Sequence, residues 1–155
     1  MSHKLPKPQL SFEIPNDADG FSPAQCPLCS ERFAIDPVEA ESESVLEIRC
    51  PKCGMASDTF IPEEIEEAIE ARIGNAVIDA INKEMKKAER RSRGKAVRFR
   101  ANEIKSKPEP KIIPEISDLD VVLCAHCRRR SKVSASLSFS AWTCPYCGVT
   151  NFNEQ

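Results

Sequence analysis

The sequence predicts a small α+β fold in which two four-cysteine β-hairpin modules are joined by one long amphipathic helix and an extended linker. Three observations lead to this prediction. All eight cysteines fall into C-x-x-C pairs, residues 62–93 combine helical periodicity with an ordered change of charge, and the following stretch is weakly periodic and contains several prolines. A single large packed core is not expected from 155 residues that include 12 prolines.

The predicted organisation has five segments. A flexible N-terminal segment covers residues 1–22, the first four-cysteine module 23–61, the helix 62–93, a basic proline-containing linker 94–118 and the second four-cysteine module 119–155. No apolar run approaches the roughly 18 residues that a membrane-spanning helix needs, and the first residues contain no continuous apolar stretch typical of a secretory signal. We therefore expect no membrane association and a cytoplasmic, reducing location.

The cysteine spacing predicts two metal sites. Twenty residues separate the first pair from the second, and sixteen separate the third from the fourth. In this range two hairpin turns can meet around one ion, and each C-x-x-C turn points both sulfurs to one side, with metal–sulfur distances of about 2.3 Å. The predicted ligands are Cys26, Cys29, Cys50 and Cys53 in the first site and Cys124, Cys127, Cys144 and Cys147 in the second.

Other readings of the cysteines are weaker. A disulfide framework belongs to secreted chains, and C-x-x-C redox motifs do not normally occur as matched pairs. Two structural Zn²⁺ per chain are therefore expected, although iron also suits an all-thiolate tetrahedron. His126 lies inside the third pair, but we expect it to face solvent because four thiolates already complete the site.

The motifs "CPLC", "CPKCG", "CAHC" and "CPYCG" resemble the zinc-ribbon family, the small four-cysteine β-structures of transcription factors, RNA polymerase subunits and ribosomal proteins. The resemblance covers about residues 25–60 and 121–152. It implies a fold and a structural role for zinc, while the family's functions are too diverse to imply one activity. Ser30 and Arg128 depart from the pattern, because they stand where a glycine often follows the second cysteine.

Within the modules the strand signals are short. Val133, Ala135, Leu137, Phe139 and Ala141 alternate with serines, and a period of two predicts a strand with one apolar face. "VLEIRC" before Cys50 is the clearest strand of the first module, and the acidic "DPVEAESES" before it reads as a solvated loop.

The helix over residues 62–93 begins with acidic side chains and ends with basic ones, an order that complements the helix dipole. Its apolar residues recur at every fourth position, a spacing that advances about 40° per step and so winds around the helix. Such a ridge suits a partner that crosses obliquely. Two interpretations stay open, a helix that covers the module cores and a helix that forms a homodimer or binds a protein partner. The apolar positions are Ile65, Ile69, Ile73, Val77, Ile81 and Met85.

Charge is divided unevenly along the chain. Residues 1–71 carry a net charge of −10 and residues 72–155 a net charge of +8, which together give the overall −2. Basic runs with neighbouring aromatic rings can bind the phosphates and bases of DNA or RNA. The alternative is a solvated face or an internal partner for the acidic half. The candidate nucleic-acid contacts are Arg90, Arg91, Arg93, Lys95, Arg98, Phe99 and Arg100 in the linker region and Arg128, Arg129 and Arg130 beside the third pair.

These observations favour a non-catalytic zinc-binding protein, with a nucleic-acid-binding or transcription-associated role. The alternative is a protein–protein adaptor or small oligomeric scaffold that binds no nucleic acid. An enzyme is disfavoured because both metal sites are coordinatively closed, and the sequence has no H-E-x-x-H motif or phosphate-binding glycine loop.

Overall fold

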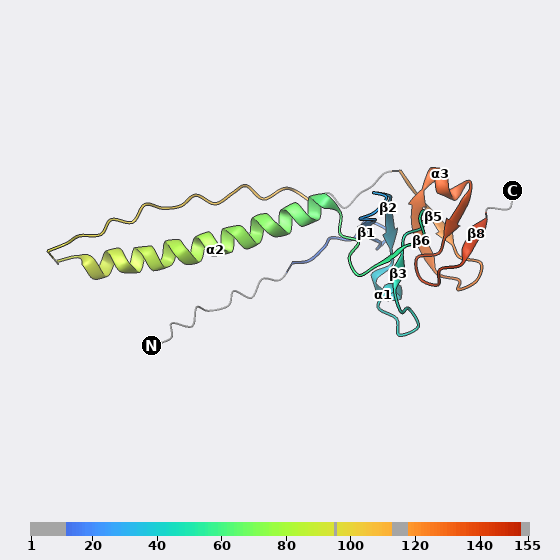
Figure 1. The fold of residues 1–155 in the computed structure, drawn as a ribbon, viewed down its shortest axis with the longest axis horizontal. Coiled ribbons are helices and arrows are strands. Elements are labelled where there is room, and N and C mark those ends of the chain that lie inside the picture. Colours follow the sequence, from blue (N-terminus) through green and yellow to red (C-terminus); the bar gives the residue numbers. More distant parts are fainter. Residues whose placement is uncertain (1–11, 95, 113–117, 153–155) are drawn as a thin grey trace. The chain divides into compact units, whose positions relative to one another are not determined.

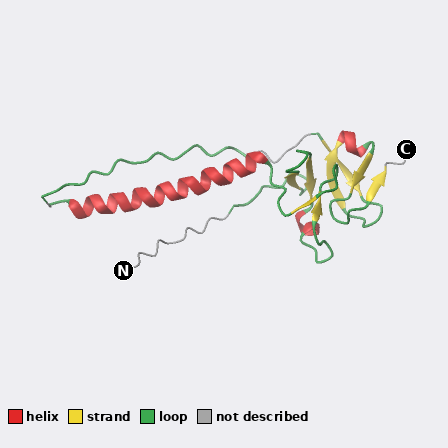
Figure 2. Cartoon of the chain, in the orientation of Figure 1, coloured by secondary structure: helices red, strands yellow, loops and turns green. Residues whose placement is uncertain are grey.

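Residues 12–94, 96–112 and 118–152 are described by the computed structural model of the chain (Figure 1; Figure 2). They belong to two compact units. One unit contains residues 14–65 and the described residues after 111, and it holds the cysteine pairs and the strands. The other contains residues 66–111, and it holds most of the long helix.

Short strands in the first unit form four antiparallel hairpins, each with one C-x-x-C pair in its turn. The hairpins are β1–β2, β3–β4, β5–β6 and β7–β8. Each predicted four-cysteine site is therefore built from the turns of two consecutive hairpins. In chain order the strands are β1 (Ser22–Gln25), β2 (Arg32–Ile35), β3 (Ile48–Arg49), β4 (Ala56–Ser57), β5 (Leu119–Leu123), β6 (Arg130–Ser134), β7 (Ala141–Thr143) and β8 (Thr150–Phe152).

A four-stranded sheet of order β1-β2-β6-β5 joins the leading hairpins of the two cysteine sites. Strands β2 and β6 are antiparallel, with Ala34 opposite Lys132 and Ile35 opposite Ser131. Ala34 and Lys132 each lie five residues after the second cysteine of their own pair. The pairing therefore relates the two halves by an approximate two-fold axis between β2 and β6. The sequence alone predicts modules joined by the helix and the linker, and the structure adds this direct connection.

The core of this unit contains residues from both halves of the chain. Trp142 and Tyr146 are buried beside Val133 and the cysteines of the second site. The Tyr146 hydroxyl accepts a hydrogen bond from the N–H of Asp36 and donates one to the carbonyl of Arg130, both at 2.8 Å. Each half thus helps to fix the same ring. The first half contributes to this core the partly buried side chains of Ile35, Ala40, Val45 and Ile48.

The alternating segment 133–141 is not one strand, contrary to the sequence prediction. Strand β6 ends at Ser134, and the helical turn α3 (Ala135–Ser138) separates it from β7. The serines form local hydrogen bonds that compete with a strand ladder, as when the Ser140 hydroxyl donates to the carbonyl of Ser136. The side chain of Phe139 is exposed, so the apolar alternation does not mark a continuous buried face.

The first half also differs in detail from the sequence prediction. The acidic stretch expected to be a loop contains the one-turn helix α1 (Pro37–Ala40), because the Asp36 carboxylate accepts hydrogen bonds from the N–H groups of Val38 and Glu39. Within "VLEIRC" only the two residues of β3 are strand.

In the second unit, helix α2 (Glu63–Ser92) agrees with the predicted helix to within one residue at each end. Residues 96–112, which we name the strap, contain no helix or strand and run back along α2 (Figure 1). Two asparagines of α2 hold the strap. The side-chain amide of Asn75 bonds both the N–H and the carbonyl of Lys107, and that of Asn82 does the same with Ile104, at 2.8–2.9 Å. Over residues 96–112 the predicted linker is thus an extended segment that is anchored to the helix, while its residues 95 and 113–117 lie outside the described residues.

Candidate metal centres and basic surface

All four C-x-x-C turns share one backbone hydrogen-bond pattern. In each turn the N–H four residues after the first cysteine donates to the carbonyl of that cysteine, at 2.9–3.0 Å. The N–H of the first cysteine donates to the carbonyl five residues later, again at 2.9–3.0 Å. The residue after the second cysteine has a positive φ in every turn: Ser30 57°, Gly54 71°, Arg128 61° and Gly148 72°.

This conformation explains the two departures from the usual knuckle sequence. Ser30 and Arg128 adopt the left-handed conformation that glycine adopts in the other two turns. A side chain there costs roughly 1–2 kcal/mol, because Cβ approaches the following carbonyl. The structure keeps the same turn despite this cost, so the sulfur positions are equivalent in all four knuckles.

The sulfur positions have the dimensions of a metal tetrahedron. In each site the four Sγ atoms lie within 4.8 Å of one another. The Sγ–Sγ distances are 3.7 Å for Cys26–Cys53 and 3.6 Å for Cys29–Cys50, and the corresponding pairs of the second site have the same values. A regular tetrahedron with a metal–sulfur distance of about 2.3 Å has edges of about 3.8 Å. The residues present therefore fit a structural metal ion in both sites.

In each site, the balance of burial and hydrogen bonding lowers the pKa of one buried thiol and raises that of another. Burial pushes the pKa of Cys26 up, but the N–H groups of Cys29 and Leu28 donate to its sulfur, and the net effect lowers the pKa to about 7. Burial outweighs similar donors at Cys50 and raises its pKa. The second site repeats this contrast, with the pKa of Cys124 lowered to about 7 and that of Cys144 raised.

The contrast has a chemical consequence. Four sulfurs so close together cannot all carry a negative charge without a cation, since like charges oppose each other's ionisation. A bound divalent ion would displace the remaining protons and occupy a site whose four corners are all thiolates. Such a site has no open coordination position, so it is suited to a structural role rather than to binding a substrate.

Sequence reasoning missed one residue that supports the second site. Asn151 is buried, its side chain accepts a hydrogen bond from the N–H of Ala125 at 2.9 Å, and it also bonds the sulfur of Cys124. No spacing rule marks this asparagine, because its partner lies 26 residues away in the chain. His126 is exposed beside it, as expected.

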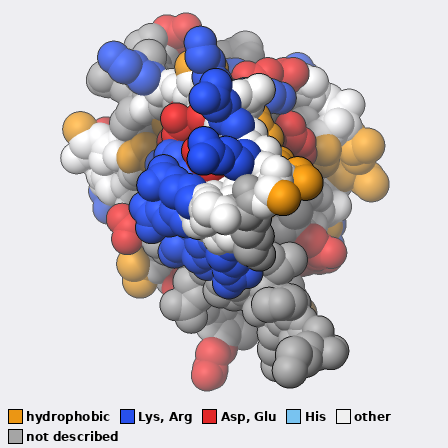
Figure 3. Space-filling view, turned by 90° about the vertical axis from the view of Figure 1, so that its left-hand side faces the viewer, with side chains coloured by type: hydrophobic (Ala, Val, Ile, Leu, Met, Phe, Trp, Pro, Cys, Tyr) orange, Lys and Arg blue, Asp and Glu red, His pale blue; other side chains and the backbone are white. Residues whose placement is uncertain are grey.

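The basic residues that the sequence singled out occupy two different settings. Arg90 and Arg91 lie in the last turn of α2, while Arg93, Arg98 and Arg100 line a groove of about 610 Å³ at the turn between α2 and the strap. We name this end of α2 and the strap the arm tip. Figure 3 looks toward it and shows Lys and Arg side chains gathered on this face. Phe99 lines the same groove and is 45% exposed, and Lys95 lies outside the described residues.

In the second basic cluster, residues 128–130, two of the three arginines form contacts within the fold. The guanidinium of Arg129 bonds the Glu39 carboxylate at 2.7 Å and the hydroxyls of Ser42 and Ser44 at 3.0 and 2.6 Å. The guanidinium of Arg130 lies 5.7 Å from the centre of the Phe21 ring. Arg128 is exposed in its knuckle. Among these three, only Arg128 presents its side chain without a contact to another described side chain.

Comparison with protein-family models, with curated proteins and with solved structures finds no match to this chain. The resemblance to zinc ribbons therefore rests on the knuckle motifs and their geometry. In the part of the chain that the structure describes, no helix is both long and apolar enough to cross a membrane.

Proposed function

We propose that the chain is a non-catalytic protein whose two four-cysteine sites each hold a structural Zn²⁺, and whose arm tip binds nucleic acid. The sulfur tetrahedra support the metal, and zinc is the commoner structural ion for four thiolates. Elemental analysis of reduced protein should return two zinc ions per chain. One metal or none would refute this part of the proposal. Visible absorption typical of iron–thiolate sites would show that the metal is iron and not zinc.

The observation that carries the nucleic-acid proposal is the ion pairing of the arginines at the arm tip. Within residues 12–94, 96–112 and 118–152, no acidic side chain forms an ion pair with Arg90, Arg91, Arg93, Arg98 or Arg100. Three basic residues nearer the middle of the helix are paired: Arg72 with Glu109, Lys86 with Glu103 and Lys87 with Glu84. The unpaired charge at the tip favours an external anion over internal compensation of the acidic half.

The aromatic ring beside these arginines specifies the kind of nucleic acid. Phe99 is exposed in the groove between Arg98 and Arg100. An exposed ring flanked by guanidinium groups can stack on an unpaired base while the arginines neutralise phosphates. We therefore propose single-stranded nucleic acid, DNA or RNA, as the ligand.

The test uses two charge-matched triple variants of the zinc-loaded protein. Replacing Arg93, Arg98 and Arg100 with Gln should weaken binding to a fluorescent single-stranded oligonucleotide. It should also make the slope of log K against log salt shallower by about 0.7 for each lost contact. Replacing Lys105, Lys107 and Lys111 of the strap with Gln removes the same charge away from the tip and should change binding much less.

Two outcomes would overturn the nucleic-acid proposal. One is equal loss of affinity in the two triple variants, which would indicate attraction to net charge alone. The other is no salt-dependent binding by the wild type at low ionic strength. The adaptor function would then be favoured, and a specific observation already supports it, since α2 exposes apolar side chains in the middle of its length.

A further inference from the structure

Helix α2 has an apolar face on the side away from the two asparagines that hold the strap. The strap is bonded to Asn75 and Asn82. At about 100° per residue, Val77 lies roughly 140–160° around the helix from both asparagines. Ile73 and Val77 are each 49% exposed and Ile81 is 43% exposed. Half-exposed β-branched side chains in a row on a long helix are typical of a surface that packs against another element.

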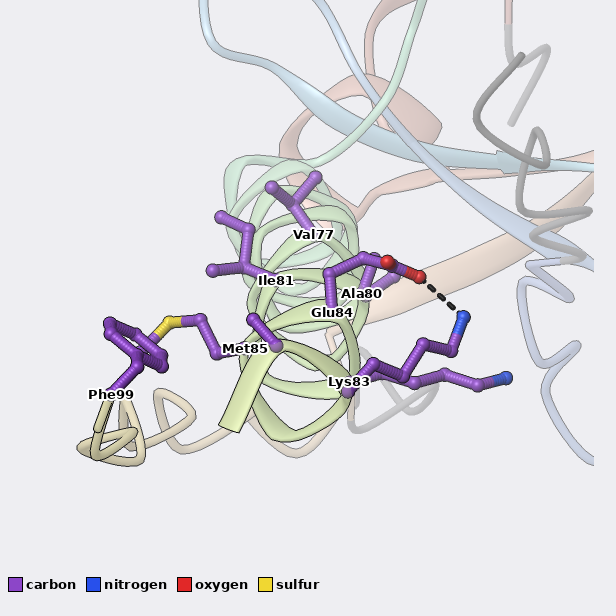
Figure 4. A pocket seen from close by; sticks show the side chains of 10 residues that line it. Val77, Ala80, Ile81, Lys83, Glu84, Met85 and Phe99 are labelled. Atoms are coloured by element: carbon purple, nitrogen blue, oxygen red, sulfur yellow. Dashed lines mark hydrogen bonds and ion pairs between the residues drawn. The ribbon is translucent and has the colours of Figure 1, made fainter. Parts of the chain in front are cut away.

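This face is hollowed as well as apolar. A groove of about 670 Å³ beside Val77 and Ile81 is also lined by Ala76, Ala80 and, from the strap, Phe99. Figure 4 shows the Val77 and Ile81 side chains projecting from the helix, with Met85 turned toward Phe99 at one end. Alanines let a second helix approach closely, and the larger side chains beside them can insert between those of a partner.

The charges along α2 identify the partner. We propose that this face binds α2 of a second copy of the chain, in antiparallel orientation and with the two-fold axis at Val77. Val77 is midway between Glu63 and Arg91, and the exposed apolar residues Ile73 and Ile81 are equally far from it. An antiparallel pair about this point places Ile73 opposite Ile81, and the acidic start of one helix beside the basic end of the other.

The register gives specific charge pairs. Glu63 faces Arg91 of the second copy near the midline of the interface, and this pair occurs twice because a two-fold interface is self-complementary. Glu70 faces Glu84, whose charge is met by Lys87 of its own helix at 2.6 Å. A parallel pair would instead place acidic residues beside acidic ones at one end and basic beside basic at the other. Charge therefore selects the antiparallel arrangement.

The free part of the ridge is short enough for two helices to lie nearly along each other. Ile65 is buried in the strand-containing unit, and Met85 shares its groove with Phe99. Of the other four ridge residues, Ile69 is only partly exposed, and the exposed Ile73, Val77 and Ile81 span about 80° of the helix surface. This width matches packing at a small crossing angle, of about 20°. Charged pairs at both ends can form only at such an angle, so the oblique crossing predicted from the full ridge is replaced by a nearly antiparallel one.

The proposal is tested with zinc-loaded full-length protein by sedimentation equilibrium over a concentration series. The wild type should approach twice the 17.3 kDa of one chain at tens of micromolar, and Val77→Asp should remain a single chain. Val97→Asp is the matched control, since Val97 is 81% exposed on the strap and is not among the residues that line the groove. It should sediment as the wild type does.

Orientation is tested by exchanging charges at Glu63 and Arg91. Glu63→Arg alone should weaken the dimer at least several-fold, and the double variant Glu63→Arg, Arg91→Glu should restore it, because each new arginine meets a new glutamate. A parallel dimer would not be restored. The proposal is overturned if the wild type is a single chain at all concentrations, if Val77→Asp still dimerises, or if the double variant dimerises no better than the single one. If the wild type is monomeric and the Val77→Asp variant unfolds at a lower denaturant concentration, the chain itself covers this face.

Discussion

The backbone N–H of Arg49, just before the second knuckle of the first site, donates to the carbonyl of Pro145 in the last knuckle of the second site at 3.0 Å. The equivalent bond runs the other way, because the N–H of Thr143 donates to the carbonyl of Pro51 at 2.8 Å. These bonds obey the same approximate two-fold relation as the pairing of β2 with β6. The two cysteine sites are thus connected at both their leading and their trailing hairpins.

This connection predicts that damage at one site is felt at the other. The sequence alone predicts that Cys53→Ser unfolds the first site and leaves the second intact. A structural zinc contributes on the order of 10 kcal/mol to folding, comparable with the whole stability of a domain. With shared strands and a shared core, we now expect Cys53→Ser to lower the stability of both sites. Trp142, the single tryptophan, is buried beside the second site and reports on it by fluorescence.

The measurement is denaturant unfolding followed by Trp142 fluorescence, with zinc content determined in parallel. Cys147→Ser, at the equivalent position of the second site, is the reciprocal variant. Cooperative sites should give one unfolding transition, shifted to lower denaturant in both variants. A Trp142 transition unchanged by Cys53→Ser would show that the sites fold independently despite the bonds between them.

Gly148 and Gly54 occupy equivalent turns, yet we expect different effects of alanine. Both have φ near +70°, so a side chain strains either by roughly 1–2 kcal/mol. At Gly148 a Cβ would also meet the Arg49 side chain, 3.0 Å from Cδ and 3.1 Å from Nε, whereas at Gly54 the nearest atom is the Thr143 hydroxyl at 3.7 Å. Gly148→Ala should therefore be the more destabilising. Adding Arg49→Ala should remove the difference, and a double-mutant cycle that shows no coupling would contradict this contact.

Lys132 and Asp17 predict a pH dependence of stability. Lys132 Nζ lies 2.7 Å from Asp17 and 2.6 Å from Asp19, with both Lys132 and Asp17 largely buried. Partial burial pushes the pKa of Asp17 up, but the Lys132 ammonium and the N–H groups of Phe21 and Asp19 outweigh it, so the pKa is lowered. Partial burial also opposes the charge of Lys132, but the two carboxylates leave its pKa raised.

The directions of these two pKa shifts define the pH range in which the ion pair stabilises the fold. A carboxyl group with a lowered pKa stabilises the fold above its unfolded pKa, and this stabilisation is lost as the pH falls through its folded pKa. A lysine with a raised pKa stabilises the fold below its unfolded pKa, and this stabilisation is lost as the pH rises through its folded pKa. Asp17→Asn should therefore cost about 1 kcal/mol between roughly pH 4 and pH 10. Chemical denaturation across pH should show the difference between wild type and variant fading outside this window. A constant difference down to pH 2 would exclude the charge as its cause.

The sequence predicted the parts of the site that depend on local spacing. Two residues between cysteines set the geometry of each knuckle, and the charge order of α2 set its ends, so the ligand sets and the helix could be identified. The pairing of Ala34 with Lys132 could not, since it joins residues 98 positions apart through backbone groups that every residue carries. The prediction of a strand through the serines of 134–140 was wrong for a related reason. Several of their hydroxyls bond groups within four residues, and the strand that their periodicity suggests ends at Ser134.

The docking of the strap corresponds to a sequence pattern that the sequence analysis did not use. Asn75 and Asn82 are seven residues apart on α2, and their partners Lys107 and Ile104 are three apart on the strap. Seven helical residues rise about 10.5 Å and three extended residues span about 10 Å, so the two repeats stay in step. Glu89, seven residues further on, accepts a hydrogen bond from the N–H of Ala101, three residues before Ile104. Polar residues at a seven-residue interval beside an extended proline-containing segment are the corresponding sequence pattern.

This ladder predicts that the buried Asn82 holds the strap more strongly than the partly exposed Asn75. Asn82→Ala removes the partners of both the N–H and the carbonyl of Ile104, which should weaken docking by about 1–2 kcal/mol and increase amide exchange at Ile104 by roughly tenfold or more. Asn82→Asp keeps an acceptor for the Ile104 N–H and loses the donor, so it should protect that amide better than alanine does. Asn75→Ala should expose Lys107 in the same way but by less, since water can replace its hydrogen bonds. Hydrogen exchange measured by NMR on the zinc-loaded protein distinguishes these cases. Equal exchange at Ile104 in the wild type and in Asn82→Ala would mean that the asparagine does not anchor the strap.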